Sequence, residues 1–270
     1  MKWMKINTGF LSILLLAVSV CQALRTPRVP AVNTRSSLQM ASSDAASSNL
    51  LVSQIHHLGP DGVSLILASQ SPRRKEILDM MGLQGRFSAT PSPLNETALQ
   101  EELSRHTDPT EYTRILAEEK AKALAESIIH TVSQPTLVLG SDTIVDLDGH
   151  ILEKPRDAPD AKRMLRALSA VQHQVHTGVA LYRVMPGETA PVLTHSFTDT
   201  AQVTFAALSD ADIDAYVASG EPMDKAGSYG IQGIGGQLVR CVEGDFFAVM
   251  GLPMHTTSRL IANALADMRG

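Results

Sequence analysis

Basic side chains gather where an apolar run meets a helix-like segment, in the sequence SPRRK at 71–75. The apolar run at 64–68 has the pattern of a buried strand, and Ser71 followed by proline is typical of the start of a helix, here over 72–81. Cations at a helix N-terminus oppose the helix dipole, which favours anions there by about 0.3–1 kcal/mol per charge. A bound phosphate would compensate, because helix N-terminal amides and arginine side chains both bind phosphate oxygens. The alternative is a solvated basic cluster on the helix surface.

A candidate acidic group follows a second apolar run. Asp142 lies in the polar triplet 141–143, directly after the apolar segment 137–140. This position predicts a carboxylate at the end of a strand, where it could bind a metal ion or orient a water molecule. The alternative role is an Asx turn before the hairpin that Asp148-Gly149 indicates.

Two lysines differ in what their surroundings predict. Lys154 precedes a proline in an extended segment, so its side chain need not lie on the outer face of a helix. Lys120 lies in a helical pattern among Glu118, Glu119 and Lys122, and the residue pattern alone predicts a surface position for it.

A glycine-rich segment, DKAGSYGIQGIGG at 224–236, contains five glycines. That is too many for the interior of a helix or strand, so the backbone turns tightly here or approaches a ligand closely. The spacing is not the dinucleotide-binding G-x-G-x-x-G, and the chain has no G-x-x-x-x-G-K-[ST]. Gln232 stands among these glycines, where its amide could bind the edge of a base.

The elements that must position these residues alternate between strand-like and helix-like patterns from residue 50 onward. We expect strands at 64–68, 87–89, 137–140, 174–184, 191–205, 236–242 and 246–251, helices at 72–81, 109–129, 157–168, 209–219 and 256–268, and an open loop at 90–97. Long strands among helices predict an α/β fold with a mixed, partly antiparallel central sheet and flanking helices. No repeat or second core is evident, so 50–270 is expected to be one domain.

Composition limits the classes of partner. A net charge of −5 argues against a broad basic face for nucleic acid, although it allows a local phosphate pocket. The chain has two cysteines, and Cys21 would leave with a cleaved N-terminus. The remaining Cys241 could form no intrachain disulfide, and we expect it to be a small buried residue on a strand.

The first residues have the features of a targeting sequence. Lys2 and Lys5 precede the apolar segment 10–20, and small residues follow at 21 and 23, which indicates a signal peptide at 1–23. The apolar segment is shorter than the roughly 18 residues that a membrane helix needs, so no stable membrane anchor is expected.

The segment 24–49 is rich in arginine and serine and has no acidic residue before Asp44, as in disordered transit peptides. A signal peptide followed by such a segment resembles the presequences of algae whose plastids are reached through the secretory pathway. We therefore expect an organelle, the plastid, with the secretory pathway or the cytoplasm as alternatives. The glycosylation sequon at Asn95 would matter only in the secretory lumen.

Four segments occur in order along the chain: LASQSPRRKEIL, LGSDTIV, LEKPRDAPDAKRML and DKAGSYGIQG. In combination they resemble the Maf family of nucleotide pyrophosphatases, from about residue 65 to the C-terminal helix. The resemblance implies a Maf/ITPase-like α/β fold with two lobes around a cleft. It also implies hydrolysis of a nucleoside triphosphate to its monophosphate and pyrophosphate with a divalent cation, Mg²⁺ or Mn²⁺, and a homodimer.

The resemblance assigns roles to particular residues. Asp142 would be the general base and, with Glu96, a metal ligand, although Asn95 replaces the second acid that the family often has beside it. The residues that would bind the phosphates are Ser71, Arg73, Arg74, Lys120 and Lys154.

Three positions indicate the substrate within the family. Arg73, Thr143 and Gln232 resemble the branch that hydrolyses dTTP and UTP, whereas the branch acting on 7-methyl-GTP tends to have Trp, Gln and Glu there. We therefore expect dTTP and UTP, and modified pyrimidine nucleotides, as substrates. The alternatives are the 7-methyl-GTP activity, another phosphate-ester or nucleotide-sugar hydrolase, and a non-catalytic nucleotide-binding regulator.

Overall fold

The computed structural model describes residues 50–103 and 107–269, which belong to one compact unit. The predicted signal peptide at 1–23 and the transit-like segment at 24–49 lie outside the described residues. Within the described ranges, no helix is both long enough and apolar enough to cross a membrane.

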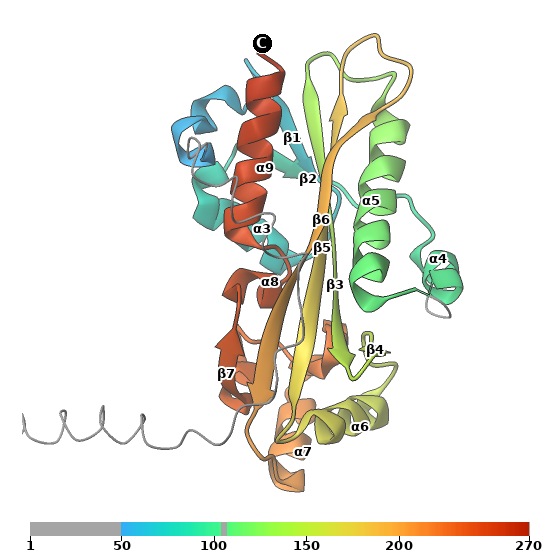
Figure 1. Cartoon of the computed structure of the whole chain (residues 1–270), viewed down its shortest axis with the longest axis vertical. Helices are drawn as coiled ribbons and strands as arrows, with labels where there is room; N and C mark the ends of the chain where they lie inside the picture. The colour runs from blue at the N-terminus through green and yellow to red at the C-terminus, as the bar shows by residue number, and fades with distance from the viewer. Residues whose placement is uncertain (1–49, 104–106, 270) are drawn as a thin grey trace, which may run out of the picture. The chain divides into compact units, whose positions relative to one another are not determined.

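A mixed sheet of seven strands lies at the centre of the described part of the chain, in agreement with the predicted α/β class (Figure 1). The strand order is β2-β1-β3-β5-β6-β7, and β4 also pairs with β3. β1 runs parallel to β2 and β3, and the other pairings are antiparallel. The strands are β1 Ser64–Leu67, β2 Phe87–Ala89, β3 Thr136–Leu147, β4 His150–Leu152, β5 Gln172–Val184, β6 Val192–Phe205 and β7 Val239–Glu243.

The strand β3 extends well beyond the parallel part of the sheet. It pairs with β5 over 136–146, whereas β1 reaches only as far as Leu139 of β3. The prediction of a strand end just before Asp142 is therefore wrong, because pairing with β5 continues past this residue. The predicted hairpin is confirmed: Asp148 and Gly149 have φ values of 52° and 83°, the positive values that a type I′ turn requires.

Helices cover both faces of the sheet. The helices are α3 Pro72–Leu78, α4 Glu96–Leu103, α5 Pro109–Ile128, α6 Ala158–Leu168, α7 Asp210–Ala218, α8 Phe246–Met250 and α9 Met254–Asp267. Short helical turns occupy Leu51–Ser53, Ile55–His57, Asp79–Leu83, Glu221–Asp224, Ala226–Ser228 and Ile234–Leu238. α5 packs on one face, against β3 and β5, and α3 and α9 pack on the other (Figure 1).

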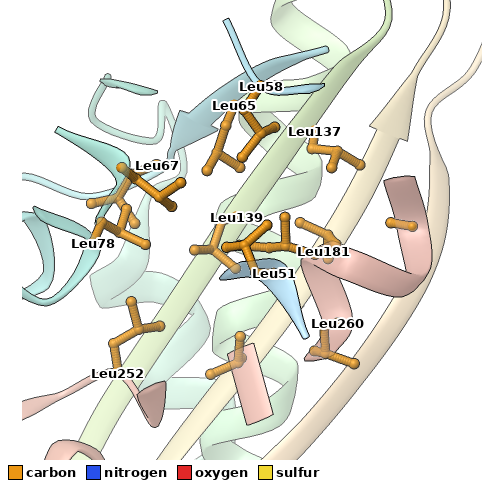
Figure 2. Close-up of a cluster of buried hydrophobic side chains, with 14 of the residues drawn as sticks. Leu51, Leu58, Leu65, Leu67, Leu78, Leu137, Leu139, Leu181, Leu252 and Leu260 are labelled. Atoms are coloured by element: carbon orange, nitrogen blue, oxygen red, sulfur yellow. The ribbon is translucent and has the colours of Figure 1, made fainter. Parts of the chain in front are cut away.

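The apolar interior has separate clusters along the long strands. One cluster joins β1, β3 and β5 to α3 and α9, and Figure 2 shows its leucines, among them Leu67, Leu139, Leu181 and Leu260. A second cluster lies toward the other end of β3 and β5, where α6 and α7 pack. Side chains alternate across a strand, so the same strands also supply apolar groups to α5 on the opposite face.

Local signals start two of the helices. Asp108 begins α5 by accepting a hydrogen bond from the Thr110 amide, while Glu111 pairs with Arg114. Ser209 begins α7, where its side chain and that of Asp212 form a complete capping box.

Three local expectations are wrong. The segment 246–251 is the helix α8 rather than a strand, because Asp245 caps its start and Gly251, with φ of 118°, ends it in a left-handed conformation. An all-apolar run carries no periodicity that separates helix from strand. The expected loop at 90–97 is shorter than predicted, because α4 begins at Glu96. Cys241 is exposed on the edge strand β7 rather than buried.

Candidate active site

A gap in the sheet creates the site. β1 and β4 pair with the same edge of β3, β1 up to Leu139 and β4 from Val145 onward, since β5 occupies the other edge. Between them, the edge of β3 over 140–144 is left without a neighbouring strand. The loops that follow β1 and β4 converge on this gap and line a cavity of about 650 Å³. This volume suits a small-molecule ligand.

The expected site residues meet at this cavity although they come from six separate segments. The residues from that set that line it are Ser71, Arg73, Arg74, Glu96, Lys120, Asp142, Thr143, Lys154 and Gln232. Among all its lining residues, five side chains are basic and four are acidic. The wall is therefore a mixed one, in which acids lie among the cations.

Asp142 and Lys120 form the buried inner wall. The Lys120 Nζ donates to Asp142 Oδ1 at 2.6 Å and lies 2.7 Å from the Glu96 carboxylate. Lys120 is only 6% exposed, so the surface position that its helical pattern predicts is wrong. The helix approaches the sheet so closely that a Cβ on Gly140 would lie 2.3 Å from the Ala117 carbonyl oxygen, and this brings Lys120 against β3.

The charge of Lys120 is held by its two partners. Burial alone would lower the pKa of Lys120, but attraction to Asp142 and Glu96 outweighs it and raises the pKa above its ordinary value. The lysine thus stays a cation inside the cavity wall.

The two arginines after Ser71 have different surroundings. Arg74 donates from Nε to the Gly251 carbonyl oxygen at 2.9 Å, and its other nitrogens donate to Ser69 and Thr143 at 3.1 and 3.2 Å. Burial lowers the pKa of Arg74 below the ordinary value. Arg73 is bound less tightly, at 3.5 Å from the largely exposed Asp224 carboxylate.

Lys154 and Gln232 lie at the exposed rim of the cavity, whereas Thr143 is half-buried on β3. Thr143 shares a hydrogen bond with Thr177 at 3.0 Å in addition to its contact with Arg74. Lys154 and Gln232 are both exposed, Lys154 after β4 and Gln232 in the glycine-rich turn. Ser71 occupies the N-cap position of α3, and its amide donates to Ser69 Oγ at 3.1 Å.

Glu153 belongs to the site although its sequence pattern does not single it out. It lines the cavity, and its carboxylate accepts hydrogen bonds from Tyr112 at 2.5 Å and from Gln100 at 3.4 Å. Burial, together with repulsion from Asp142, raises the pKa of Glu153. The only sequence signal is its place next to Lys154, and the partners on α4 and α5 become neighbours only in the fold.

The donor set fits a divalent cation held jointly with a substrate. Among the described residues, Oδ2 of Asp142 is buried without a hydrogen-bond partner, and the Glu96 carboxylate is 44% exposed nearby. No group of three or more metal-binding side chains occurs in the described ranges. Two carboxylates without a complete protein cage are what Mg²⁺ uses when substrate phosphates supply other ligands.

Comparison with known proteins agrees with this arrangement. A family model described as "Maf-like protein" matches residues 64–264, a stretch that contains the whole cavity lining. The chain belongs to the Maf family. A Maf relative from Shewanella sp. (strain MR-7), named dTTP/UTP pyrophosphatase, is 50% identical over 206 residues, which cover 75% of this chain and 98% of the relative. A protein of the same name from Bacillus pumilus is 43% identical over 197 residues, covering 73% of this chain and 94% of the relative.

Among solved structures, a HAM1 protein from Coxiella burnetii is similar with a TM-score of 0.32 and 14% identity. The match covers 76% of this Maf chain and 99% of that protein. A likeness at this level adds nothing to the fold described above.

Proposed function

We propose that this chain is a nucleoside triphosphate pyrophosphatase that hydrolyses dTTP and UTP, and modified pyrimidine nucleotides, to the monophosphate and pyrophosphate. One observation carries the proposal: Asp142 has a buried, unpartnered carboxylate oxygen in a cavity whose wall also contains Arg73, Arg74, Lys120 and Lys154. Cations to neutralise phosphates and a carboxylate to activate water are what phosphoanhydride hydrolysis requires.

The basic residues bind the triphosphate in this proposal. Arg74 is fixed by its contacts to Gly251, Ser69 and Thr143, so it presents a positioned charge at little further cost in side-chain entropy. Lys154 is exposed and Arg73 is half-buried with a single exposed ion-pair partner, so both can close on the outer phosphates.

Asp142 acts as the general base. Its Oδ1 accepts a hydrogen bond from Lys120, which fixes the orientation of the carboxylate, and the carboxylate removes a proton from a water molecule. The water oxygen bonds to the α-phosphorus, the bond from that phosphorus to the bridging oxygen breaks, and pyrophosphate leaves with its charge neutralised by the basic residues.

Asp142 and Glu96 would hold a divalent cation, Mg²⁺ or Mn²⁺. When bound, such a cation neutralises phosphate charge and polarises the phosphoryl oxygens. Lys120 touches both carboxylates, so it fixes the side chains that would hold the cation.

Base choice is assigned to the cavity rim. Gln232 is exposed in a turn that lines the cavity, where its amide can pair with the edge of a pyrimidine. Arg73 forms an ion pair with Asp224, which precedes this turn in the chain. Thr143 instead accepts a hydrogen bond from Arg74.

We also propose that the chain forms a homodimer, as the resemblance to the Maf family implies. We propose further that it reaches a plastid after removal of residues 1–49, a proposal supported by the composition of that segment. Light scattering of the purified protein would test the dimer. Mass spectrometry of the native N-terminus would test the processing, and an intact Met1 on the native protein would contradict it.

The activity is tested by measuring pyrophosphate release from a panel of nucleoside triphosphates with added Mg²⁺ or Mn²⁺. We expect UTP and dTTP to have the highest kcat/KM, and Asp142→Asn to lower kcat by about 10²- to 10⁴-fold with an unchanged circular dichroism spectrum. A preference for 7-methyl-GTP would contradict the substrate assignment. Binding of UTP without turnover would contradict the enzymatic one, as would release of inorganic phosphate in place of pyrophosphate.

A further inference from the structure

Hydrogen bonds hold both ends of the turn that contains Gln232. It runs from Gly230 to Gly235, and its central residues Ile231 and Gln232 line the cavity. Before the turn, the Tyr229 ring is buried and its hydroxyl lies 2.9 Å from His173 Nε2. The residues that bind the turn itself are Tyr216 and Glu221, which precede it in the chain.

The Glu221 carboxylate binds the end of the turn. Its Oε2 accepts a hydrogen bond from the Ile234 amide at 2.8 Å, and its Oε1 accepts one from the Gly235 amide at 3.0 Å. A Cβ on Gly233 would lie 2.4 Å from Glu221 Oε2, so the glycine there permits the close approach of the carboxylate. Part of the glycine content is thus explained by contact with Glu221.

Tyr216 on α7 connects this carboxylate to the start of the turn. Its hydroxyl donates to Glu221 Oε1 at 2.9 Å and accepts from the Gly230 amide at 3.0 Å. A Cβ on Gly235 would lie 2.4 Å from the same hydroxyl. One buried hydroxyl and one carboxylate therefore hold both ends of the segment that presents Gln232.

The network keeps Glu221 ionised. Burial opposes ionisation, but hydrogen bonds from the Gly235 and Ile234 amides and from Tyr216 outweigh it and lower the pKa of Glu221. Neither Glu221 nor Tyr216 is among the residues that line the cavity. The backbone of Glu221 also meets the cavity lining, because its carbonyl oxygen accepts a hydrogen bond from Lys225 Nζ at 2.7 Å. A change confined to the Glu221 carboxylate keeps this carbonyl and acts on a bound nucleotide through the turn.

We propose that Glu221, with Tyr216, is a positioning residue that fixes the Gly230–Gly235 turn and thereby sets how strongly the cavity discriminates between nucleotide bases. The inference rests on the proposed function and deepens it, because it adds a residue that controls base choice from outside the cavity. Arg74, Asp142 and Lys120 belong to other segments, and Arg73 pairs with Asp224 rather than with Glu221 or Tyr216. The Glu221 carboxylate and the Tyr216 hydroxyl therefore act on the turn and not directly on these phosphate-binding side chains.

The test is Glu221→Gln in the full chain. The amide oxygen can accept one hydrogen bond from the turn, but the amide nitrogen faces a second backbone N–H, so the turn loses part of its support. We expect the ratio of kcat/KM for UTP to that for GTP to fall by about tenfold, which corresponds to about 1.4 kcal/mol. The change should appear in KM, with kcat for UTP within about twofold of the wild-type value.

Three further variants separate loss of positioning from a general loss of folding or activity. Gln232→Ala should lower the same ratio, and the double variant should lose no more than the larger single loss, since both changes act through one contact. Asp214→Asn is the matched control, because Asp214 lies on α7 and pairs with Lys162 at the exposed surface. It should leave the ratio unchanged.

Hydrogen exchange gives a readout that does not need turnover. The Ile234 and Gly235 amides should exchange faster in Glu221→Gln than in the wild type. If Glu221→Gln fails to fold, Tyr216→Phe removes the bridging hydroxyl and keeps the aromatic ring. The Gly230 amide, which then loses its acceptor, should exchange faster, and the same fall in the kcat/KM ratio is expected.

The outcomes distinguish the two proposals. If the wild type releases no pyrophosphate, the proposed function fails, and base discrimination is measured instead from the binding of non-hydrolysable UTP and GTP analogues. An unchanged ratio in folded Glu221→Gln and Tyr216→Phe would overturn the inference while leaving the proposed function intact. A fall in kcat equal for all nucleotides would also overturn it.

Discussion

Lys120 balances two carboxylates at once, Asp142 and Glu96, at the inner wall of the cavity. Removing one member of a buried, hydrogen-bonded charge pair leaves the other without compensation, which costs more than the pair itself contributes. The same lysine therefore serves both the stability of the wall and the proposed chemistry, because it orients the carboxylate that activates water.

The substitution Lys120→Met tests both roles of this lysine. We expect the free energy of unfolding to fall by about 1–3 kcal/mol, since Asp142 loses its partner while cavity water still reaches Glu96. We expect kcat/KM for UTP to fall by at least about 10²-fold, because the base is no longer oriented. Urea denaturation and pyrophosphate release measure the two effects.

Lys122→Met is the matched control. Lys122 lies on the same helix and pairs with Glu119 at 3.7 Å on the surface, so its loss should change stability by less than about 0.5 kcal/mol. Equal effects of the two substitutions would contradict the role given to Lys120.

Among the elements, α5 sets the depth of the site by its distance from the sheet. Glycines occupy the two strands where the helix backbone crosses them: a Cβ on Gly140 would meet the Ala117 carbonyl oxygen, and one on Gly178 would lie 2.1 Å from that of Thr113. Backbone atoms cannot rotate away, so a larger residue at either position must displace the helix.

We therefore predict that Gly178→Ala destabilises the protein by about 3 kcal/mol, at the upper end of the cost of overpacking. It should also lower activity, because Lys120 moves with α5. Gly187→Ala is the control: its φ of 83° strains an alanine by about 1–2 kcal/mol, but the space around it is open and it lies outside the cavity. A Gly178→Ala protein with wild-type activity and stability would contradict this account.

For the molecule as a whole, acid stability is linked to a buried histidine. His173 packs edge-on against Phe205 and Tyr229 and is 2% exposed. Burial lowers the pKa of His173 to about 4 from the ordinary 6.5. Between these values the unfolded chain binds a proton that the folded protein does not.

This difference in proton binding makes the folded protein less stable as the pH falls. The contribution of His173 is fully present above about pH 6.5 and is lost as the pH falls toward about 4, with an upper limit of about 3 kcal/mol from the size of the shift. We expect the urea midpoint, followed by circular dichroism, to fall less steeply with acid in His173→Gln than in the wild type. His150→Gln, at an exposed position in β4, should keep the wild-type slope. A His173→Gln slope as steep as the wild type would contradict the assignment.

The sequence by itself determined the features that depend on near neighbours in the chain. Asp108 and Ser209 start their helices, and Asp148-Gly149 forms its turn, because the groups that cap or bend the backbone lie within a few residues of each other. The class of sheet follows from strand and helix patterns of the same kind, and the order of four motifs indicated the family.

The tertiary structure alone decided how these pieces form a site. Asp142 lies inside β3 because β5 continues to pair with it, and Lys120 is buried because Gly140 lets α5 approach the sheet. Glu221 reaches the turn around Gln232 through hydrogen bonds that span about a dozen residues. Strand pairing, helix approach and burial are set by segments far apart in the chain, so no pattern around a single residue contains them.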